Sequence, residues 1–270
     1  MSRHWSSLAK KVFGRLLEKS TRAERLEKLY KGEDFLDAYR EHTDNRVERD
    51  PHAAVGGMWE EIGRLQFEFL VNNGLRPDQR LLDIGCGTLR GGRHFIKYMN
   101  AGNYSGIDIS PKAIEYGKHL VAQEGLSEKQ PRLQVSRNKD LRFEEFDGEV
   151  FDYLLAQSVF THLKPEHIEE CFEHVGRIMK QDSIFFFTFN REDREFKQIG
   201  LKDFGYPFAF FQRLADEHGF DVRDRSADYS HPRGQHMAML SKKSGGRRPD
   251  APGRLRTSPN LTGPDRCDPV

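Results

Sequence analysis

The sequence predicts an α/β domain built on a seven-stranded, mostly parallel sheet whose last strand is antiparallel, with helices on both faces. Three observations lead to this prediction. Short apolar runs alternate with stretches of helical apolar spacing, as in β-α-β units. A glycine turn, Gly85-Cys86-Gly87, follows the first run directly. The last two runs are joined by one loop that is too short for a crossover helix, so they must be antiparallel.

Two further segments flank this domain, which we place at residues 54–243. Residues 1–53 are charge-rich with helical spacing, which predicts an N-terminal helical extension. Within it, residues 5–17 form a basic amphipathic pattern that could contact an anionic membrane surface. The alternative is that this apolar stripe packs on the domain or on a second subunit. Residues 244–270 are polar and nearly free of apolar side chains, so we expect a disordered tail.

Size, charge and cysteine content restrict the class of protein. A chain of 270 residues with 36% hydrophobic residues fits one catalytic domain with extensions. The net charge of +1 gives no general attraction to nucleic acid. The three cysteines form neither a disulfide framework nor a zinc pattern, so we expect a cytoplasmic protein with no metal site. No apolar run has the length of a membrane span, and no signal peptide is visible.

Local signals place the individual elements. Ser110-Pro111 supplies an N-cap followed by a proline at the first helical position, and Gly219 stands where glycine commonly ends a helix. The near-continuous apolar run over 151–157 is typical of a central strand covered on both faces. We expect helices over 59–73, 111–124, 165–178 and 208–218, and strands over 81–84, 104–108, 132–135, 151–157, 183–189, 220–227 and 235–241, with a helical pattern between the first two strands.

The glycine turn and an acidic residue predict a nucleoside-binding site. Gly85 and Gly87 carry no side chains, so the turn can bend sharply while a ligand lies against its backbone. Asp108 follows Gly85 by about twenty positions and ends the second strand. A carboxylate there can accept both hydroxyls of a ribose. A cofactor that contains a nucleoside is therefore expected.

Two details argue against a dinucleotide as this cofactor. The spacing Gly85-x-Gly87-x-x-x-Gly91 is one residue longer than the pattern that sets a pyrophosphate on a helix N-terminus. Asp83, two residues before the turn, would repel a diphosphate and suits a ligand with positive charge. Because these details disfavour a dinucleotide, a nicotinamide-dependent oxidoreductase is the alternative and not the leading prediction.

This arrangement resembles motif I of the class I S-adenosylmethionine (SAM) methyltransferases, in the bacterial Methyltransf_11/12/25-like group. The resemblance covers about residues 58–242 and includes DIGCG with Asp108, the stretch over 151–163, and the terminal hairpin that carries HPRGQ. It implies a Rossmann-like methyltransferase sheet, SAM as cofactor and S-adenosylhomocysteine (SAH) as product. The resemblance does not fix the acceptor, because this fold hosts many. The leading hypothesis is methyl transfer to an oxygen or nitrogen of a small-molecule or glycan-type acceptor. A non-catalytic SAM-binding scaffold is a further alternative.

The resemblance also implies roles for single residues. The turn and the acid before it would hold the methionine part of SAM, and the second-strand acid would hold the ribose. A polar residue after the third strand, Asn138 or Asp140, would contact the adenine, and Gln157 or Ser158 the amino group near the transferred methyl. The expected cofactor contacts are Asp83, Gly85, Cys86, Gly87, Asp108, Ile109, Asn138, Asp140, Gln157 and Ser158.

The acceptor should bind among the loops at the carboxyl ends of the strands. Two histidines in these loops, His162 and His231, could act as general base for a hydroxyl acceptor. The alternatives are a capping or filling role for His162 and a loop-bracing hydrogen bond for His231. Tyr229, Arg233 and Asn190, the last at the start of a loop over 190–206, are expected acceptor contacts. Trp59, Arg64 and Gln66 could form a lid or contact the cofactor carboxylate, or could be core and surface residues.

Overall fold

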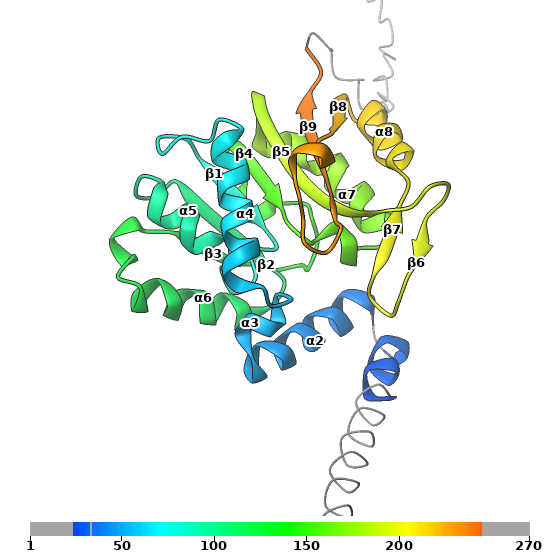
Figure 1. Cartoon of the computed structure of the whole chain (residues 1–270), viewed down its shortest axis with the longest axis horizontal. Helices are drawn as coiled ribbons and strands as arrows, with labels where there is room; N and C mark the ends of the chain where they lie inside the picture. The colour runs from blue at the N-terminus through cyan, green and yellow to red at the C-terminus, as the bar shows by residue number, and fades with distance from the viewer. Residues whose placement is uncertain (1–23, 33, 245–270) are drawn as a thin grey trace, which may run out of the picture.

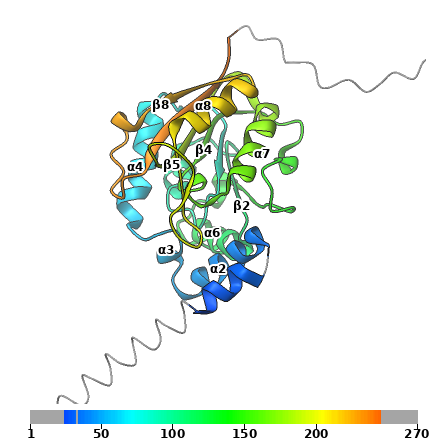
Figure 2. The ribbon, with the colours of Figure 1, turned by 90° about the vertical axis from the view of Figure 1, so that its right-hand side faces the viewer.

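A twisted open sheet with helices on both faces forms the centre of the computed structural model, which describes residues 24–32 and 34–244 (Figure 1, Figure 2). In this part of the chain nine strands join the sheet, and two of them form a small additional hairpin. The other seven lie in the order β3-β2-β1-β4-β5-β9-β8, in which only β9 runs antiparallel to its neighbours. The predicted fold class is therefore confirmed. The strands are β1 (Leu81–Ile84), β2 (Tyr104–Asp108), β3 (Arg132–Val135), β4 (Phe151–Ala156), β5 (Met179–Arg191), β8 (Phe220–Asp224) and β9 (His236–Lys242).

The helices begin and end close to the predicted positions. Ser110 caps the helix over 111–123 by accepting a hydrogen bond from the amide of Ala113, with Pro111 at the first helical position. Gly219 follows the last helix with a φ of +78°, in the left-handed region that favours glycine. The helices around the sheet are α4 (Trp59–Asn72), α5 (Gly92–Tyr98), α6 (Pro111–Gln123), α7 (Pro165–Val175) and α8 (Phe208–Glu217).

The two faces of the sheet have separate apolar cores, and β5 contributes to both. Phe185, Phe187 and Phe189 pack on the side of α7 and α8, whereas Phe186 packs on the side of α4. Side chains alternate between the faces of a strand, so the run of phenylalanines fills two cores at once. Phe211 of α8 lies among the first group, with its ring centroid 4.8 Å from that of Phe189.

The largest difference from the sequence prediction lies between β5 and α8. There the expected loop over 190–206 contains a hairpin of β6 (Lys197–Gln198) and β7 (Phe204–Tyr206). Strand β7 pairs with the end of β5, which extends beyond the predicted strand to Arg191. Strands of two and three residues are too short to show an alternating pattern, so periodicity could not reveal them.

Two helices of the N-terminal segment, α2 (Phe35–Arg49) and α3 (Pro51–Ala54), lie against the start of α6 (Figure 1). The Ser110 hydroxyl donates to the carboxylate of Asp44, and Thr88 donates to the Pro51 carbonyl at 3.0 Å. The domain boundary after residue 53 stays a prediction, and it falls inside α3. The amphipathic pattern over 5–17 and nearly all of the expected tail lie outside the described residues. None of the described helices is long and apolar enough to cross a bilayer.

Replacing Phe211 with alanine should lower the free energy of unfolding by about 3 to 5 kcal/mol, because a fully buried ring would leave a cavity among packed aromatic side chains. Phe210→Ala is the matched control, since the preceding residue of the same helix is only half-buried. Urea denaturation followed by circular dichroism measures both. Equal losses for the two variants would contradict this account of the core.

Candidate active site

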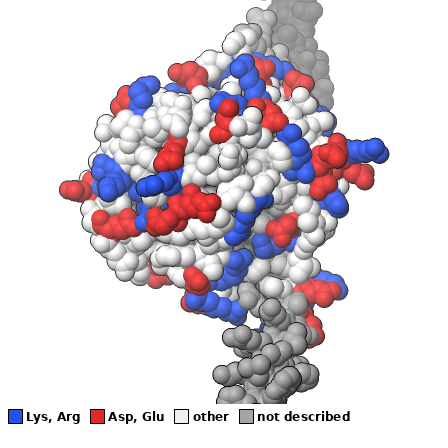
Figure 3. Space-filling view, viewed as in Figure 1, with Lys and Arg blue, Asp and Glu red and all other residues white. Residues whose placement is uncertain are grey.

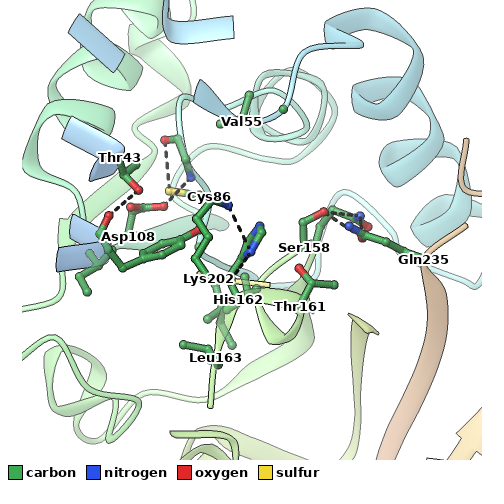
Figure 4. Close-up of a pocket in the computed structure, with 18 of the residues that line it drawn as sticks. Thr43, Val55, Cys86, Asp108, Ser158, Thr161, His162, Leu163, Lys202 and Gln235 are labelled. Atoms are coloured by element: carbon green, nitrogen blue, oxygen red, sulfur yellow. Dashed lines mark hydrogen bonds between the residues drawn. The ribbon is translucent and has the colours of Figure 1, made fainter. Parts of the chain in front are cut away.

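A cavity of about 650 Å³ lies where β1, β2, β4 and β5 end (Figure 4). The glycine turn, α2, the α3–α4 turn, the β6–β7 hairpin and the β8–β9 loop contribute to its lining. Its volume is typical of sites for small molecules. One end contains the glycine turn with Asp83 and Asp108, and the other, which we call the acceptor end, contains His162 and Asn190.

The glycine turn is shaped so that a ligand can lie against its backbone. Gly85 and Gly87 have φ angles of +67° and +54°, in the region that favours glycine. The amides of Gly85 and Cys86 both donate to the Ile107 carbonyl, at 2.8 and 3.1 Å. A Cβ at Gly85 would come 2.5 Å from a methyl of Val159, and one at Gly87 would come 2.6 Å from a methyl of Val55. The absence of side chains at Gly85 and Gly87 therefore lets Val159 and Val55 pack directly against the backbone of the turn.

Asp108 is fixed beside this turn, as Figure 4 shows. Its two oxygens accept hydrogen bonds from the amides of Gly87 and Ser110, each at 2.8 Å. Burial raises the pKa of Asp108 to about 6, against the opposing effect of these hydrogen bonds. Each carboxylate oxygen keeps a further lone pair. Asp108 can therefore accept ribose hydroxyls without losing the contacts that hold it.

Asp83 lines the cavity below the turn and accepts a hydrogen bond from the Tyr104 hydroxyl at 2.8 Å. Burial raises the pKa of Asp83 to about 7, while the Tyr104 hydrogen bond and the Arg90 guanidinium lower it. An ionised carboxylate here is costly without a cation in contact with it. A positively charged ligand group would supply that cation.

The α3–α4 turn is held over the glycine turn by arginines. Arg90, which is buried, donates to the carbonyls of Val55 and Gly57 at 2.6 and 3.1 Å. Arg233 of the β8–β9 loop donates to the carbonyl of Gly56. Burial lowers the pKa of Arg90 to about 10, so its guanidinium still carries its charge at neutral pH. Together these contacts close the cofactor end of the cavity.

The residues predicted as a lid are not brought together. Gln66 is buried and lines the cavity. Trp59 stacks on His52 with ring centroids 3.9 Å apart and does not line the cavity, and Arg64 is exposed, 3.7 Å from Glu68. The closing contacts come instead from Arg90 and Arg233. No local pattern distinguishes Arg90 from a surface arginine, because its burial depends on the packing of α2 to α4.

After β3, the structure separates the two candidates for the adenine contact. Asp140 lines the cavity, as does Ile109 after β2. Asn138 is exposed and its amide donates to Glu144 at 3.3 Å. Asp140 is therefore the one of the pair that could reach a bound nucleoside.

At the end of β4, polar side chains form a connected group. Ser158 has a φ of +58°, and its amide donates to the Thr188 hydroxyl at 2.7 Å. The Ser158 hydroxyl and the Gln157 amide both donate to the side-chain carbonyl of Gln235, at 2.9 and 3.1 Å (Figure 4). Tyr229, predicted to contact an acceptor, is buried behind Gln157 and donates to it at 2.6 Å. Tyr229 thus orients Gln157 and does not line the cavity.

His162 stands at the acceptor end with one ring nitrogen held by the β6–β7 hairpin. Its Nδ1 lies 2.9 Å from both the Asp203 carboxylate and the Lys202 carbonyl. Burial lowers the pKa of His162, so the ring is neutral at pH 7. The hydrogen bond to His162 lowers the pKa of Asp203 to about 2. Sequence analysis missed Asp203 because it lies about forty residues along the chain in a loop without a motif.

His231 has the opposite arrangement. Its Nδ1 accepts a hydrogen bond from the Arg233 amide at 3.3 Å, so the proton of the neutral ring is on Nε2. Burial, together with the positive charges of Arg90 and Arg233, lowers the pKa of His231 to about 4. Asn190 also lines the cavity and donates to the Phe204 carbonyl at 3.0 Å. Within the described chain, no group of three or more His, Cys, Asp or Glu side chains could hold a metal ion.

Residues 82–185 match the model of a family described as a methyltransferase domain. The chain is 26% identical over 124 residues to sterol 24-C-methyltransferase ERG6B of Gibberella zeae, over 46% of this chain and 31% of that protein. It is 27% identical over 129 residues to uncharacterized protein RP028 of Rickettsia prowazekii, over 48% of each. The chain thus spans less than half the length of these curated relatives.

Solved structures share the fold. Magnesium protoporphyrin IX methyltransferase of Synechocystis, with bound SAM, has a TM-score of 0.60 at 15% identity, covering 78% of this chain and 99% of that one. A TehB-like SAM-dependent methyltransferase of Corynebacterium glutamicum has a TM-score of 0.53 at 22% identity, covering 75% and 99%. These matches confirm the fold that the resemblance implied.

The residues at the cofactor end fit SAM. The turn at Gly85 and Gly87 lines the cavity, so its backbone can contact the amino-acid part, and Asp83 provides the negative charge that the cationic groups of SAM require. Asp108 has lone pairs for the ribose hydroxyls. The lining at this end of the cavity thus suits SAM, and equally SAH, which differs only by the transferred methyl group.

SAH should bind less tightly as the pH falls through 7. Its protonated amino group favours the ionised form of Asp83, so affinity is full above the pKa of about 7 and falls by up to about tenfold per pH unit below it. Calorimetry between pH 6 and 8 measures this. Asp83→Asn should bind weakly with little pH dependence, whereas Asp78→Asn, at an exposed surface pair, should behave like the unmodified protein. An affinity that is constant over this range would contradict the role of Asp83.

Domain match and fold agree with the chemistry of the cavity. The matched residues contain the glycine turn, Asp108 and the end of β4, which together form the cofactor end. Residues 82–185 therefore match a methyltransferase domain, and the described chain has the fold of the solved SAM-dependent methyltransferases.

Proposed function

We propose that this protein transfers the methyl group of SAM to a hydroxyl oxygen of a small-molecule acceptor, with His162 as the general base. The observation that carries the proposal is the pairing of His162 with Asp203 at the acceptor end of a cavity whose other end fits SAM. Similar proteins are named for small-molecule acceptors, among them magnesium protoporphyrin IX, a sterol and, as a 7-O-methyltransferase, mitomycin.

The sulfonium of SAM supplies an activated methyl group, so the protein's main contribution is alignment in a site closed to water. Alignment of this kind accounts for up to about 7 to 11 kcal/mol in intramolecular reactions. Here α2 and the α3–α4 turn cover the cavity. A hydroxyl acceptor keeps its proton at neutral pH, so a base is needed as the new carbon–oxygen bond forms.

His162 has the tautomer that a base requires. Two acceptors lie 2.9 Å from Nδ1, the Asp203 carboxylate and the Lys202 carbonyl, against one donor at 3.4 Å, the Lys202 ammonium. We therefore assign the proton to Nδ1 and the lone pair to Nε2. Within the described residues, Nε2 has no hydrogen-bond partner and is not fully buried. An acceptor hydroxyl could therefore reach it. The Asp203 carboxylate then stabilises the imidazolium that forms when Nε2 takes the proton of the acceptor hydroxyl.

His231 suits a structural role better. Its Nε2 carries the proton and is buried without a partner, and its Nδ1 is occupied by the Arg233 amide. A ring in this state has no free lone pair to accept a proton from an acceptor. His231 therefore braces the loop that presents Arg233 to the α3–α4 turn.

His162→Ala should lower kcat by about 10² to 10⁴-fold while SAH affinity stays within about twofold, because the ring acts on the acceptor and not on the cofactor. SAH release from labelled SAM, with a metabolite extract of the source cells as acceptor pool, measures turnover. His174→Ala, outside the cavity, is the control. Full turnover by His162→Ala would remove this residue from the mechanism.

Asp203→Asn should keep the position of the ring but remove the charge that raises its basicity. The rate should increase with pH through the pKa of His162, and the variant should shift this rise to lower pH and reach a lower plateau. The pH profile of kcat/KM in the same assay separates this from a loss of folding, which would lower the rate without moving the profile. An unshifted profile would contradict the pairing.

A further inference from the structure

Exposed apolar side chains gather on the β6–β7 hairpin. Phe196, Ile199 and Leu201 are 40%, 54% and 42% exposed, and among the described residues only one other large apolar side chain, Met58, is exposed to a similar degree. Single exposed apolar residues are ordinary on protein surfaces. Three within six positions of one hairpin form a patch, and such patches commonly mark binding surfaces.

The hairpin patch, defined as Phe196, Ile199 and Leu201, is continuous with the cavity. Ile199 lines the cavity, and the amides of Ile199 and Gly200 both donate to the Asp203 carbonyl, at 2.7 and 3.2 Å. The same short turn therefore fixes Asp203 against His162 and places Ile199 at the cavity mouth. An acceptor whose reacting group lies beside His162 could therefore contact Ile199 with its remaining part.

Apolar side chains of other elements line the same end of the cavity. Leu36 and Tyr39 of α2 contribute, and the Tyr39 ring centroid is 5.5 Å from that of His162. Leu163 follows His162 and also lines the cavity (Figure 4). The hairpin contacts α2 through Lys202, whose ammonium lies 5.7 Å from the Tyr39 ring. His162 thus stands at the inner end of an apolar passage.

The charges around the patch do not suit an anionic membrane. Glu192, Asp193 and Glu195 are interspersed with Arg194 and Lys197 along the hairpin. Figure 3 likewise shows acidic and basic side chains mixed over this face, with no purely basic area. Attraction to anionic lipid requires clustered lysine and arginine. An uncharged apolar group is the better partner for this surface.

We propose that the acceptor is an amphipathic small molecule whose hydroxyl reaches His162 inside the cavity while its apolar body leaves over Ile199 and the rest of the hairpin patch. This inference rests on the proposed methyl transfer and specifies the class of acceptor. Phe196 supports the outer end, since its ring packs 5.3 Å from that of Tyr206 and remains partly exposed. Burying such apolar surface favours binding in proportion to the area removed from water.

The first experiment asks where the methyl group goes. The full-length protein is incubated with methyl-labelled SAM and a protein-free extract of the source cells, which is then divided between chloroform–methanol and water. The proposal expects the label mainly in the organic phase. Label confined to the aqueous phase would overturn the amphipathic acceptor and leave methyl transfer intact. No label in either phase, from protein that binds SAH, would instead contradict the proposed methyl transfer.

The second experiment tests the patch with a double variant, Ile199→Ser with Leu201→Ser. Its apparent KM for the organic fraction should rise about tenfold, because two half-exposed side chains lose their apolar contact, while SAH affinity stays within about twofold. Unchanged SAH affinity shows that the variant is folded. Leu120→Ser, at a half-exposed apolar residue of α6 that does not line the cavity, should leave the KM unchanged. An unchanged KM in the double variant would overturn the proposal.

Discussion

The carboxylate of Asp108 joins the elements on which the site depends. It accepts the amide of Gly87 from the glycine turn and the amide of Ser110 from the start of α6. Ser110 in turn caps α6 and donates to Asp44, which anchors α2 over the cavity. One buried acid thus connects the turn below the cofactor with the helix above it. Its burial raises the pKa of the acid, and the backbone hydrogen bonds reduce that effect.

Charged side chains of both signs line the cavity. Asp83, Asp108 and Asp140 lie at the end with the glycine turn, which Arg90 and Lys139 also line. Two of these three carboxylates are buried, and a cationic cofactor suits them. At the other end His162 pairs with Asp203, and Lys202 stands beside the same carboxylate. A neutral histidine next to an ionised carboxylate can take a proton, as the proposed reaction requires.

The sequence allowed correct prediction of residue positions where these are set by local strand and turn patterns. The turn with Asp83 and Asp108 could be predicted, because strand periodicity and glycine spacing place these residues on adjacent strand ends. The β6–β7 hairpin and Asp203 could not, since strands of two and three residues leave no periodic signal and their contact with His162 bridges about forty residues. Tyr229 misled for a related reason. It stands in a loop between polar residues, but its ring packs on Phe69 with centroids 4.9 Å apart, a contact that sequence spacing does not reveal.

The hydrogen bonds that hold the α3–α4 turn over the glycine turn restrict how this side of the cavity can open. Val55 lies so close to Gly87 that even a single methyl group added there would collide with it. Arg90 holds the Val55 carbonyl and Arg233 the Gly56 carbonyl, so the turn is fixed against the glycine turn. Moving it away from Gly87 would require both guanidinium contacts to open. The hinge for such a movement is already present in Gly56 and Gly57, whose left-handed backbone angles few other residues would tolerate.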